Sequence, residues 1–374
     1  MRRILLFDMD GVLLEPQGYH RALQETVRLV GEALGYSDVI LTPEDIAAFE
    51  AAGVSSEWDS AAICAAKLLE NLLRVDPTIQ IPSTLNSRSQ SSHRLDAPDF
   101  QAVVKLLDQD DLRDLYPLKR AGKVLPQHPE IAKILRTARE PENSLTHRTF
   151  QELILGSVEF EHTYNLPRQF ESESYLSRYD RSMIPEALLA DLQKWLKMEQ
   201  HGAAIFTNRP SRGPSGNVST PEAEIGAALV GLSELPIVGF GELSWLSADH
   251  QFDSDAFLKP SPVHALAALL RAIGTPAMDA LQAAAQLVQE GERNPVWKAL
   301  NGAQVYAFED TRAGLNSVQS GYELLADIGI EIKLTLWGIT TSKMKTVALI
   351  NTGALVHDQI STALEQTLSS PEAL

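Results

Sequence analysis

The sequence predicts an α/β fold, with a parallel β-sheet at its core and a large, mostly α-helical region inserted after the first strand. Three observations support this prediction. A short apolar run opens the chain, almost no β-type alternation occurs between residues 18 and 180, and helical and strand patterns alternate from about residue 185 onward. The predicted core is therefore discontinuous, comprising residues 1–17 and 185–374, and the inserted helical domain comprises residues 18–184.

The first predicted strand is RILLF, residues 3–7. A short, continuous apolar run that ends in polar turn residues is typical of a parallel strand buried on both faces. The following residues, DMDGV, include Asp8 and Asp10, and Gly11 permits a sharp turn. We therefore expect the chain to leave the sheet at Asp8.

The inserted region carries clear helix boundaries and one long loop. Gly35 is expected to end the first helix, and Thr42 and Pro43 form the N-cap and first position of the second. Residues 76–97 are rich in Ser, Pro and Asn and predict an exposed loop. The predicted helices are 20–34, 42–53, 55–75, 99–107, 130–138 and, as one long element, 144–165.

In the C-terminal half, strand patterns alternate with amphipathic helical patterns, as they do in βαβ units. Residues 274–300 add an extra helical stretch. The Pro- and Gly-rich residues 209–221 predict a loop. The predicted strands are AAIFTN at 203–208, PIVGFG at 236–241, AQVYAFED at 303–310 and IKLTLWGI at 332–339.

Composition narrows the classes of function. The 374 residues carry a net charge of −17 and no long cluster of Lys and Arg, so nucleic-acid binding is not expected. No apolar run approaches the roughly 20 residues of a membrane span, and no membrane association is expected. The single cysteine, Cys64, suits a reducing compartment, and the expected location is the cytoplasm. Nothing in the sequence indicates an oligomeric state.

Polar residues follow the predicted strands where a parallel sheet binds its ligands, at the carboxyl ends of the strands. Two or three carboxylates at one edge repel each other, and a divalent cation would neutralise them. Carboxylate oxygens are ligands that favour Mg²⁺. A carboxylate can form an aspartyl-phosphate, while a lysine and a hydroxyl can hold the transferring oxygens. This pattern predicts phosphoryl transfer. The residues concerned are Asp8, Asp10, Thr207, Asn208, Lys259, Glu309 and Asp310.

These motifs resemble those of the haloacid dehalogenase (HAD)-like hydrolase superfamily, in the subfamily with a helical C1-type cap inserted after the first motif. The resemblance covers residues 1–17 and about 185–340 and implies a Rossmann-like core. The first motif, D-x-D-G-[TV], matches residues 8–12, and the second, a strand ending in [ST]-N, matches IFTN. The third, Lys before a helix, matches Lys259-Pro260, and the fourth, E-D-[ST]-x-x-G, matches residues 309–314.

The resemblance implies a role for each matched residue. Asp8 would be the nucleophile and a metal ligand, and Asp10 the general acid/base, with its main-chain carbonyl also on the metal. Thr207 and Lys259 would bind the phosphoryl group, and Asn208 would orient Asp8 or the substrate. Asp310 would be the acidic metal ligand, with Glu309 at its side, directly or through water. Dehalogenases and phosphonate-cleaving relatives lack the second carboxylate, so Asp10 argues against both.

The implied function is that of a Mg²⁺-dependent phosphatase acting on a small phosphorylated metabolite. Sugar phosphomutases keep both aspartates and remain an alternative, as does a non-catalytic ligand-binding protein on this scaffold. Substrate choice is expected to come from the cap, with residues 53–60 as the candidate specificity loop. In this loop Trp58 could stack on a substrate and Asp59 could hydrogen-bond to it. The alternative is that Trp58 packs in the core and Asp59 caps a helix. Arg209, directly after the second motif, is a further candidate for substrate binding.

Overall fold

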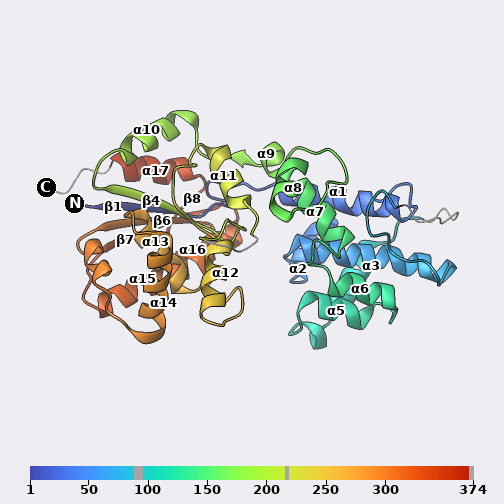
Figure 1. Cartoon of the computed structure of the whole chain (residues 1–374). Coiled ribbons are helices and arrows are strands. Elements are labelled where there is room, and N and C mark those ends of the chain that lie inside the picture. The colour runs from blue at the N-terminus through green and yellow to red at the C-terminus, as the bar shows by residue number, and fades with distance from the viewer. Residues whose placement is uncertain (88–95, 215–218, 370–374) are drawn as a thin grey trace. The chain divides into compact units, whose positions relative to one another are not determined.

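The computed structural model describes residues 1–87, 96–214 and 219–369. The chain forms two compact units, Met1–Pro16 with Asp180–Leu374 and Gln17–Tyr179. We call the first the α/β unit and the second the helical unit (Figure 1). The boundaries expected from the sequence lie after residues 17 and 184.

The α/β unit is built on a six-stranded sheet whose paired strands are all parallel. The central strand β1 pairs with β4 on one side and with β6 on the other. In spatial order the strands are β5 (Ile237–Val238), β4 (His201–Phe206), β1 (Arg3–Phe7), β6 (Gln304–Glu309), β7 (Lys333–Ile339) and β8 (Leu355–His357). This is the Rossmann-like α/β core that the sequence predicts.

Helices cover both faces of this sheet (Figure 1). Along β1, Ile4 and Leu6 belong to one buried cluster and Leu5 and Phe7 to the other, because successive side chains of a strand point to opposite faces. The first cluster lies against α12–α16 and the second against α10, α11 and α17. The helices of this unit are α10 (Glu186–Leu196), α11 (Glu222–Val230), α12 (Phe240–Asp249), α13 (Pro262–Ala272), α14 (Ala277–Glu290), α15 (Arg312–Asp327), α16 (Lys343–Ile350) and α17 (Ile360–Ser369), with the 3₁₀ helix η2 (Pro295–Leu300).

A short ribbon lies where the chain leaves and re-enters this unit. Strand β2 (Leu14–Glu15) pairs antiparallel with β3 (Arg181–Ser182). The register places Leu14 opposite Ser182 and Glu15 opposite Arg181. The outgoing and returning segments are therefore hydrogen-bonded to each other.

The regular elements among the described residues of the inserted unit are all helices, as predicted. Thr42 caps α2 in a capping box, in which its side chain accepts from the backbone of Asp45 and the Asp45 carboxylate accepts in return. The elements are α1 (Gly18–Ala33), α2 (Pro43–Ala51), α3 (Glu57–Val75), α4 (Phe100–Leu107), η1 (Asp110–Leu112), α5 (Pro117–Val124), α6 (Pro129–Arg136), α7 (Leu145–Leu155), α8 (Ser157–Tyr164) and α9 (Tyr175–Tyr179). Within the predicted 76–97 loop, residues 88–95 lie outside the described ones.

Two predicted elements are wrong in extent. The single helix expected at 144–165 is divided at Gly156, whose φ of +81° an α-helix does not allow, and a Cβ there would lie 2.8 Å from the backbone nitrogen of Ser174. The strand expected at 236–241 is only the two residues of β5, because α12 begins at Phe240. The Gly239 N–H donates to the Glu242 carboxylate and so starts that helix.

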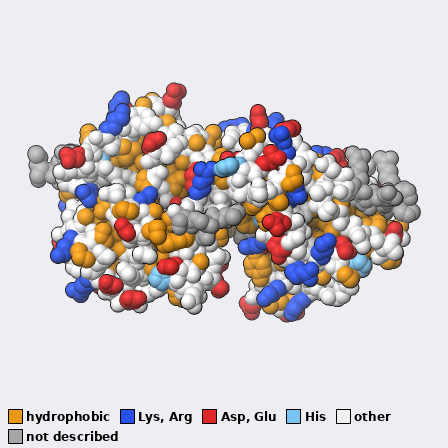
Figure 2. All heavy atoms as spheres, in the orientation of Figure 1, with side chains coloured by type: hydrophobic (Ala, Val, Ile, Leu, Met, Phe, Trp, Pro, Cys, Tyr) orange, Lys and Arg blue, Asp and Glu red, His pale blue; other side chains and the backbone are white. Residues whose placement is uncertain are grey.

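The surface is mixed in charge, and none of the described helices is long and apolar enough to cross a membrane. Figure 2 shows acidic and basic side chains on the visible face of each unit. The net charge of −17 is thus carried on a surface where both signs occur.

Candidate active site

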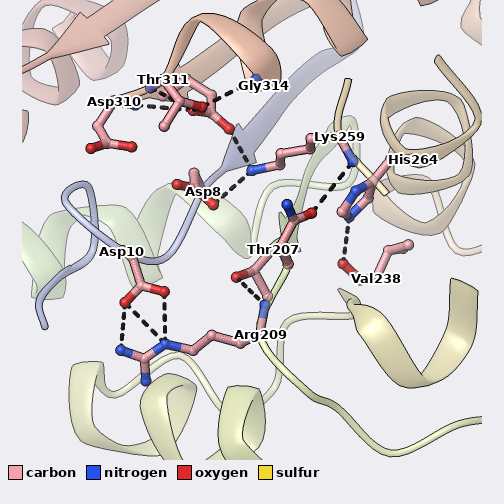
Figure 3. A network of polar contacts seen from close by, with 12 residues as sticks. Asp8, Asp10, Thr207, Arg209, Val238, Lys259, His264, Asp310, Thr311 and Gly314 are labelled. Carbon is pink, nitrogen blue, oxygen red and sulfur yellow. Dashed lines mark hydrogen bonds and ion pairs between the residues drawn. The ribbon is translucent and has the colours of Figure 1, made fainter. Parts of the chain in front are cut away.

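The carboxyl ends of three adjacent strands bring the predicted residues of the core together. Phe7, the last residue of β1, pairs with Ile205 of β4 and Phe308 of β6, so the polar residues after these strands share one edge of the sheet. Asp8 follows β1 and Thr207 follows β4 (Figure 3), and Glu309 is the last residue of β6. These residues are far apart in the sequence, and the pairing of the strands makes them neighbours in the structure.

Lys259 lies at the centre of this group. Its Nζ is 2.6 Å from Oδ1 of Asp8 and also pairs with Oε1 of Glu309, and its side chain is only 4% exposed. The ammonium also sits 3.9 Å from the centre of the Phe206 ring, which favours a cation. Burial acts to lower the pKa of Lys259, but the charges of Asp8 and Glu309 outweigh it and the pKa is raised. The lysine is therefore a fixed cation.

Burial and mutual repulsion act on the carboxylates. Burial raises the pKa of Asp8 well above its usual value, with a further rise from the charge of Glu309 that Lys259 partly offsets. Burial also raises the pKa of Asp310, against the opposing effect of Lys345. An additional cation at this edge would stabilise the charged forms of Asp8 and Asp310 and so lower both pKa values.

Glu309 organises the loop that follows β6. Its Oε2 accepts from the backbone N–H of Asp310 at 3.1 Å and from the backbone and hydroxyl of Thr311 at 3.0 and 2.8 Å. Thr311 in turn caps α15 by accepting from the N–H of Gly314 at 3.1 Å. With Oε1 on Lys259, both oxygens of Glu309 are engaged, so it positions the loop and the lysine.

The acidic group fits a divalent metal ion. One carboxylate oxygen from each of Asp8, Glu309 and Asp310 lies within 4.8 Å of the others. Oδ2 of Asp8 and Oδ1 of Asp310 have no hydrogen-bond partner among the described residues, while Oδ2 of Asp310 pairs with Lys345. An all-oxygen donor set suits a hard cation such as Mg²⁺. We therefore regard Asp8 and Asp310 as the ligands best placed to hold one.

Gly11 brings the turn after β1 against the loop after β6. Its φ is +73°, and a Cβ would lie 2.7 Å from Oδ2 of Asp310. The Gly11 N–H donates to the carbonyl of Leu14 at 2.8 Å, which closes the turn. The backbone thus approaches Asp310 as closely as a residue without a side chain permits.

Asp10 and Arg209 form a bidentate ion pair. The Nε of Arg209 lies 3.0 and 2.9 Å from the two oxygens of Asp10, and Nη2 donates to Asp10 and, at 2.9 Å, to Asp180. The Arg209 side chain is 2% exposed. Where the sequence suggested contact with a substrate, this structure directs Arg209 at the carboxylate of Asp10 (Figure 3) and at that of Asp180.

Thr207 and Asn208 lie beside Lys259. The Thr207 hydroxyl is buried and accepts from the Arg209 N–H at 3.1 Å, and the exposed Asn208 accepts through Oδ1 from the Lys259 N–H at 3.4 Å. His264 lies behind them, fully buried, with Nε2 2.9 Å from the carbonyl of Val238 (Figure 3). Burial, followed by the charge of Lys259, lowers the pKa of His264 to about 3. The imidazole is therefore neutral.

Trp58 and Asp59 belong to the helical unit and are engaged within it. Asp59 is 1% exposed and accepts from Nε and Nη2 of Arg139 at 3.3 and 3.2 Å. The Trp58 ring lies 5.4 Å from the His147 ring, and the Arg139 guanidinium lies 5.7 Å from the Trp58 centroid. In place of the expected substrate contacts, the structure shows an internal cluster. Arg139 carried no sequence signal that separates it from a solvated surface arginine.

Comparisons with known proteins support the fold. No protein-family model and no curated protein matches the sequence. An X-ray structure of a Northeast Structural Genomics Consortium target superposes with a TM-score of 0.66 at 16% identity, over 98% of each chain. The phosphatase Tt82 from Thermococcus thioreducens has a TM-score of 0.44 at 14% identity, over 98% of this chain and 100% of that chain. The first likeness shows a shared fold, and neither establishes an activity.

Proposed function

We propose that this chain is a Mg²⁺-dependent phosphatase of the haloacid dehalogenase type, which hydrolyses a small phosphorylated metabolite through an aspartyl-phosphate at Asp8. One observation carries the proposal: Asp8 directly follows the central strand, with Nζ of Lys259 2.6 Å from one of its carboxylate oxygens and two further carboxylates close by. The order of the four sequence motifs supports it independently. The core residues are those that phosphoryl transfer needs.

Each residue of the core has a chemical task in this proposal. Asp8 attacks phosphorus through its unpaired oxygen, while Lys259 and the Thr207 hydroxyl hold the phosphoryl oxygens. Asp10 gives a proton to the departing alkoxide and later takes one from the attacking water. Mg²⁺ held by Asp8 and Asp310 would supply positive charge against the phosphoryl oxygens and the clustered carboxylates. Glu309 keeps Lys259 in place.

The test is release of inorganic phosphate from p-nitrophenyl phosphate with and without Mg²⁺. We expect turnover that a chelator removes, and a loss of at least about 10³-fold in the Asp8→Asn variant. Asp327→Asn, at an exposed position on α15, is the matched control and should keep full activity. Turnover that survives in Asp8→Asn would exclude the aspartyl-phosphate route.

A phosphomutase is the second candidate, because Asp10 supplies the acid/base that such an enzyme also needs. The two differ in the acceptor of the phosphoryl group. With a sugar phosphate, ³¹P NMR distinguishes free phosphate from phosphate on another carbon of the sugar. Ligand binding without turnover on any phosphate ester would instead indicate a non-catalytic protein on this scaffold.

A further inference from the structure

Arg209 is held through both its backbone and its side chain. Its N–H donates to the Thr207 hydroxyl, and its carbonyl accepts from the N–H of Phe240 at 3.0 Å. Helix α11 packs on the guanidinium at Gly226, where a Cβ would lie 3.3 Å from Nη1 of Arg209 and 2.5 Å from Sδ of Met9. The backbone and the side chain of Arg209 are thus both fixed.

The two carboxylates that share this guanidinium differ in burial. Asp180 has a side-chain exposure of 0%, whereas Asp10 is 38% exposed. Separating a buried ion pair leaves an uncompensated charge and is strongly unfavourable, so the Arg209–Asp180 pair is the permanent one. Asp10 borders solvent and can leave the guanidinium at lower cost. Arg209 therefore has one anchoring partner and one exchangeable partner.

We infer that Arg209 is a positioning residue, which Asp180 orients so that its guanidinium holds the carboxylate of Asp10 for proton transfer. The inference rests on the proposed function, because it gives Asp10 the acid/base role. Arg209 contacts the carboxylate of Asp10 and takes no part itself in the bonds that form and break. Its effect on the reaction passes through the orientation of Asp10.

The chemistry explains why a bidentate partner is useful. In the first step an Asp8 oxygen bonds to phosphorus, the ester P–O bond breaks, and the Asp10 proton moves to the departing alkoxide, which leaves as an alcohol. In the second step Asp10 takes a proton from water, the water oxygen bonds to phosphorus, and the bond between Asp8 and phosphorus breaks. Between the steps Asp10 is a carboxylate, and the planar guanidinium fixes both its oxygens as a lysine ammonium would not.

The position of Asp180 adds a connection to the ribbon. Asp180 directly precedes β3, and Asp10 lies at the start of the turn that leads into β2, with a bridge between Asp10 and Leu14. One guanidinium therefore joins the segment that leaves the α/β unit to the segment that returns. The acid/base is held at the point where the two linking segments meet.

The experiment measures kcat/KM, which reports the step in which the leaving group departs and not the later hydrolysis of the aspartyl-phosphate, for a series of phosphate monoesters from 2,4-dinitrophenyl phosphate to phenyl and alkyl phosphates in the presence of Mg²⁺. A good leaving group departs without a proton, whereas an alkoxide requires one. For Arg209→Lys we expect a loss of at least about tenfold on phenyl and alkyl phosphates, and about threefold or less on the dinitrophenyl ester. Asp180→Asn should show the same dependence on leaving group, and it carries the test if Arg209→Lys does not fold.

Arg3→Lys is the matched control. Arg3 has the same 3% residue exposure as Arg209, and it lies at the opposite end of β1 between the rings of Trp195 and Tyr306. Its substitution should leave the leaving-group dependence unchanged. Equal losses along the ester series in Arg209→Lys and Asp180→Asn, or no loss, would overturn the role of Arg209 and leave the phosphatase proposal standing. Wild-type protein without turnover on any ester would overturn both.

Discussion

Gly11 and Asp310 approach so closely that a methyl group on Gly11 would lie 2.7 Å from Oδ2 and 2.8 Å from Cγ of Asp310. The contact joins the turn that carries Asp10 to the loop that carries the proposed metal ligand. Because backbone meets side chain directly, neither segment can move closer to the other without displacing its atoms. The left-handed φ of +73° at Gly11 adds a second requirement for glycine.

Gly11→Ala should therefore weaken Mg²⁺ binding. The added methyl group must displace the Asp310 carboxylate, and we expect the dissociation constant, measured by calorimetry, to rise about tenfold. The matched control is Gly302→Ala, since Gly302 has a φ of +77° and no heavy atom within 4 Å of its Cβ position. Both variants should lose roughly 1 kcal/mol of unfolding free energy. Equal Mg²⁺ affinity in the two variants would contradict the proposed role of Asp310.

Lys345→Met should strengthen Mg²⁺ binding. The Lys345 ammonium pairs with Oδ2 of Asp310, so a metal ion competes with it for the carboxylate. Since the Lys345 side chain is 51% exposed, we expect only a two- to fivefold decrease, roughly, in the dissociation constant. Lys343→Met, at an exposed lysine two residues earlier on α16, is the control and should have no effect. Weaker binding in Lys345→Met would show that Lys345 supports the metal site.

Asp59→Asn distinguishes a structural role from a substrate contact in the helical unit. Asp59 is 1% exposed and is bonded twice by Arg139, whose side chain is 50% exposed. We expect the variant to lose about 1–2 kcal/mol of unfolding free energy in guanidinium titrations, with kcat/KM on p-nitrophenyl phosphate changed less than about twofold. A double-mutant cycle with Arg139→Met would isolate the pair. Undiminished stability with a large loss of kcat/KM would support the original expectation of substrate contact.

His264 should make the α/β unit sensitive to acid. Burial lowers its pKa from 6.5 to about 3, so the folded protein keeps it neutral while the unfolded chain takes up a proton below pH 6.5. Its contribution to stability is present above pH 6.5 and is lost as the pH falls toward 3.

His264→Gln removes this proton uptake and supplies the test. Between pH 7.5 and 5 the wild type should lose about 2 kcal/mol of unfolding free energy relative to the variant. The measurement is the difference between the two proteins at each pH, so groups that both share cancel. A difference that does not vary with pH would exclude His264 as the source.

The central part of the fold is predictable from sequence for a physical reason. Strands buried on both faces read as continuous apolar runs, and β1, β4, β6 and β7 all have that pattern. The division of the long helix at Gly156 was missed, because a lone glycine in a helical pattern is usually tolerated. Its positive φ and the close approach of Ser174 are features that only the tertiary structure reveals.

In the site, too, some residues can be predicted from the local sequence pattern, whereas others depend on tertiary packing. Asp8, Thr207, Lys259 and Asp310 follow from their places at strand ends and helix starts. The pairing of Arg209 with Asp180 could not be predicted in this way, because Asp180 is distant in sequence and lies in a segment without a motif. Lys345 likewise reaches Asp310 from an exposed helix with no recognisable signature.

The β2–β3 ribbon brings together the two points at which the inserted unit could be removed from the chain. Because Glu15 lies opposite Arg181 in an antiparallel pair, the two cut points are neighbours, and a hairpin turn of two residues such as Asn-Gly could join them directly. Such a deletion would alter no strand of the six-stranded sheet and no step in its order. The helical unit is thus an insertion at one point of the chain, and a different insertion there would leave the order of the six strands unchanged.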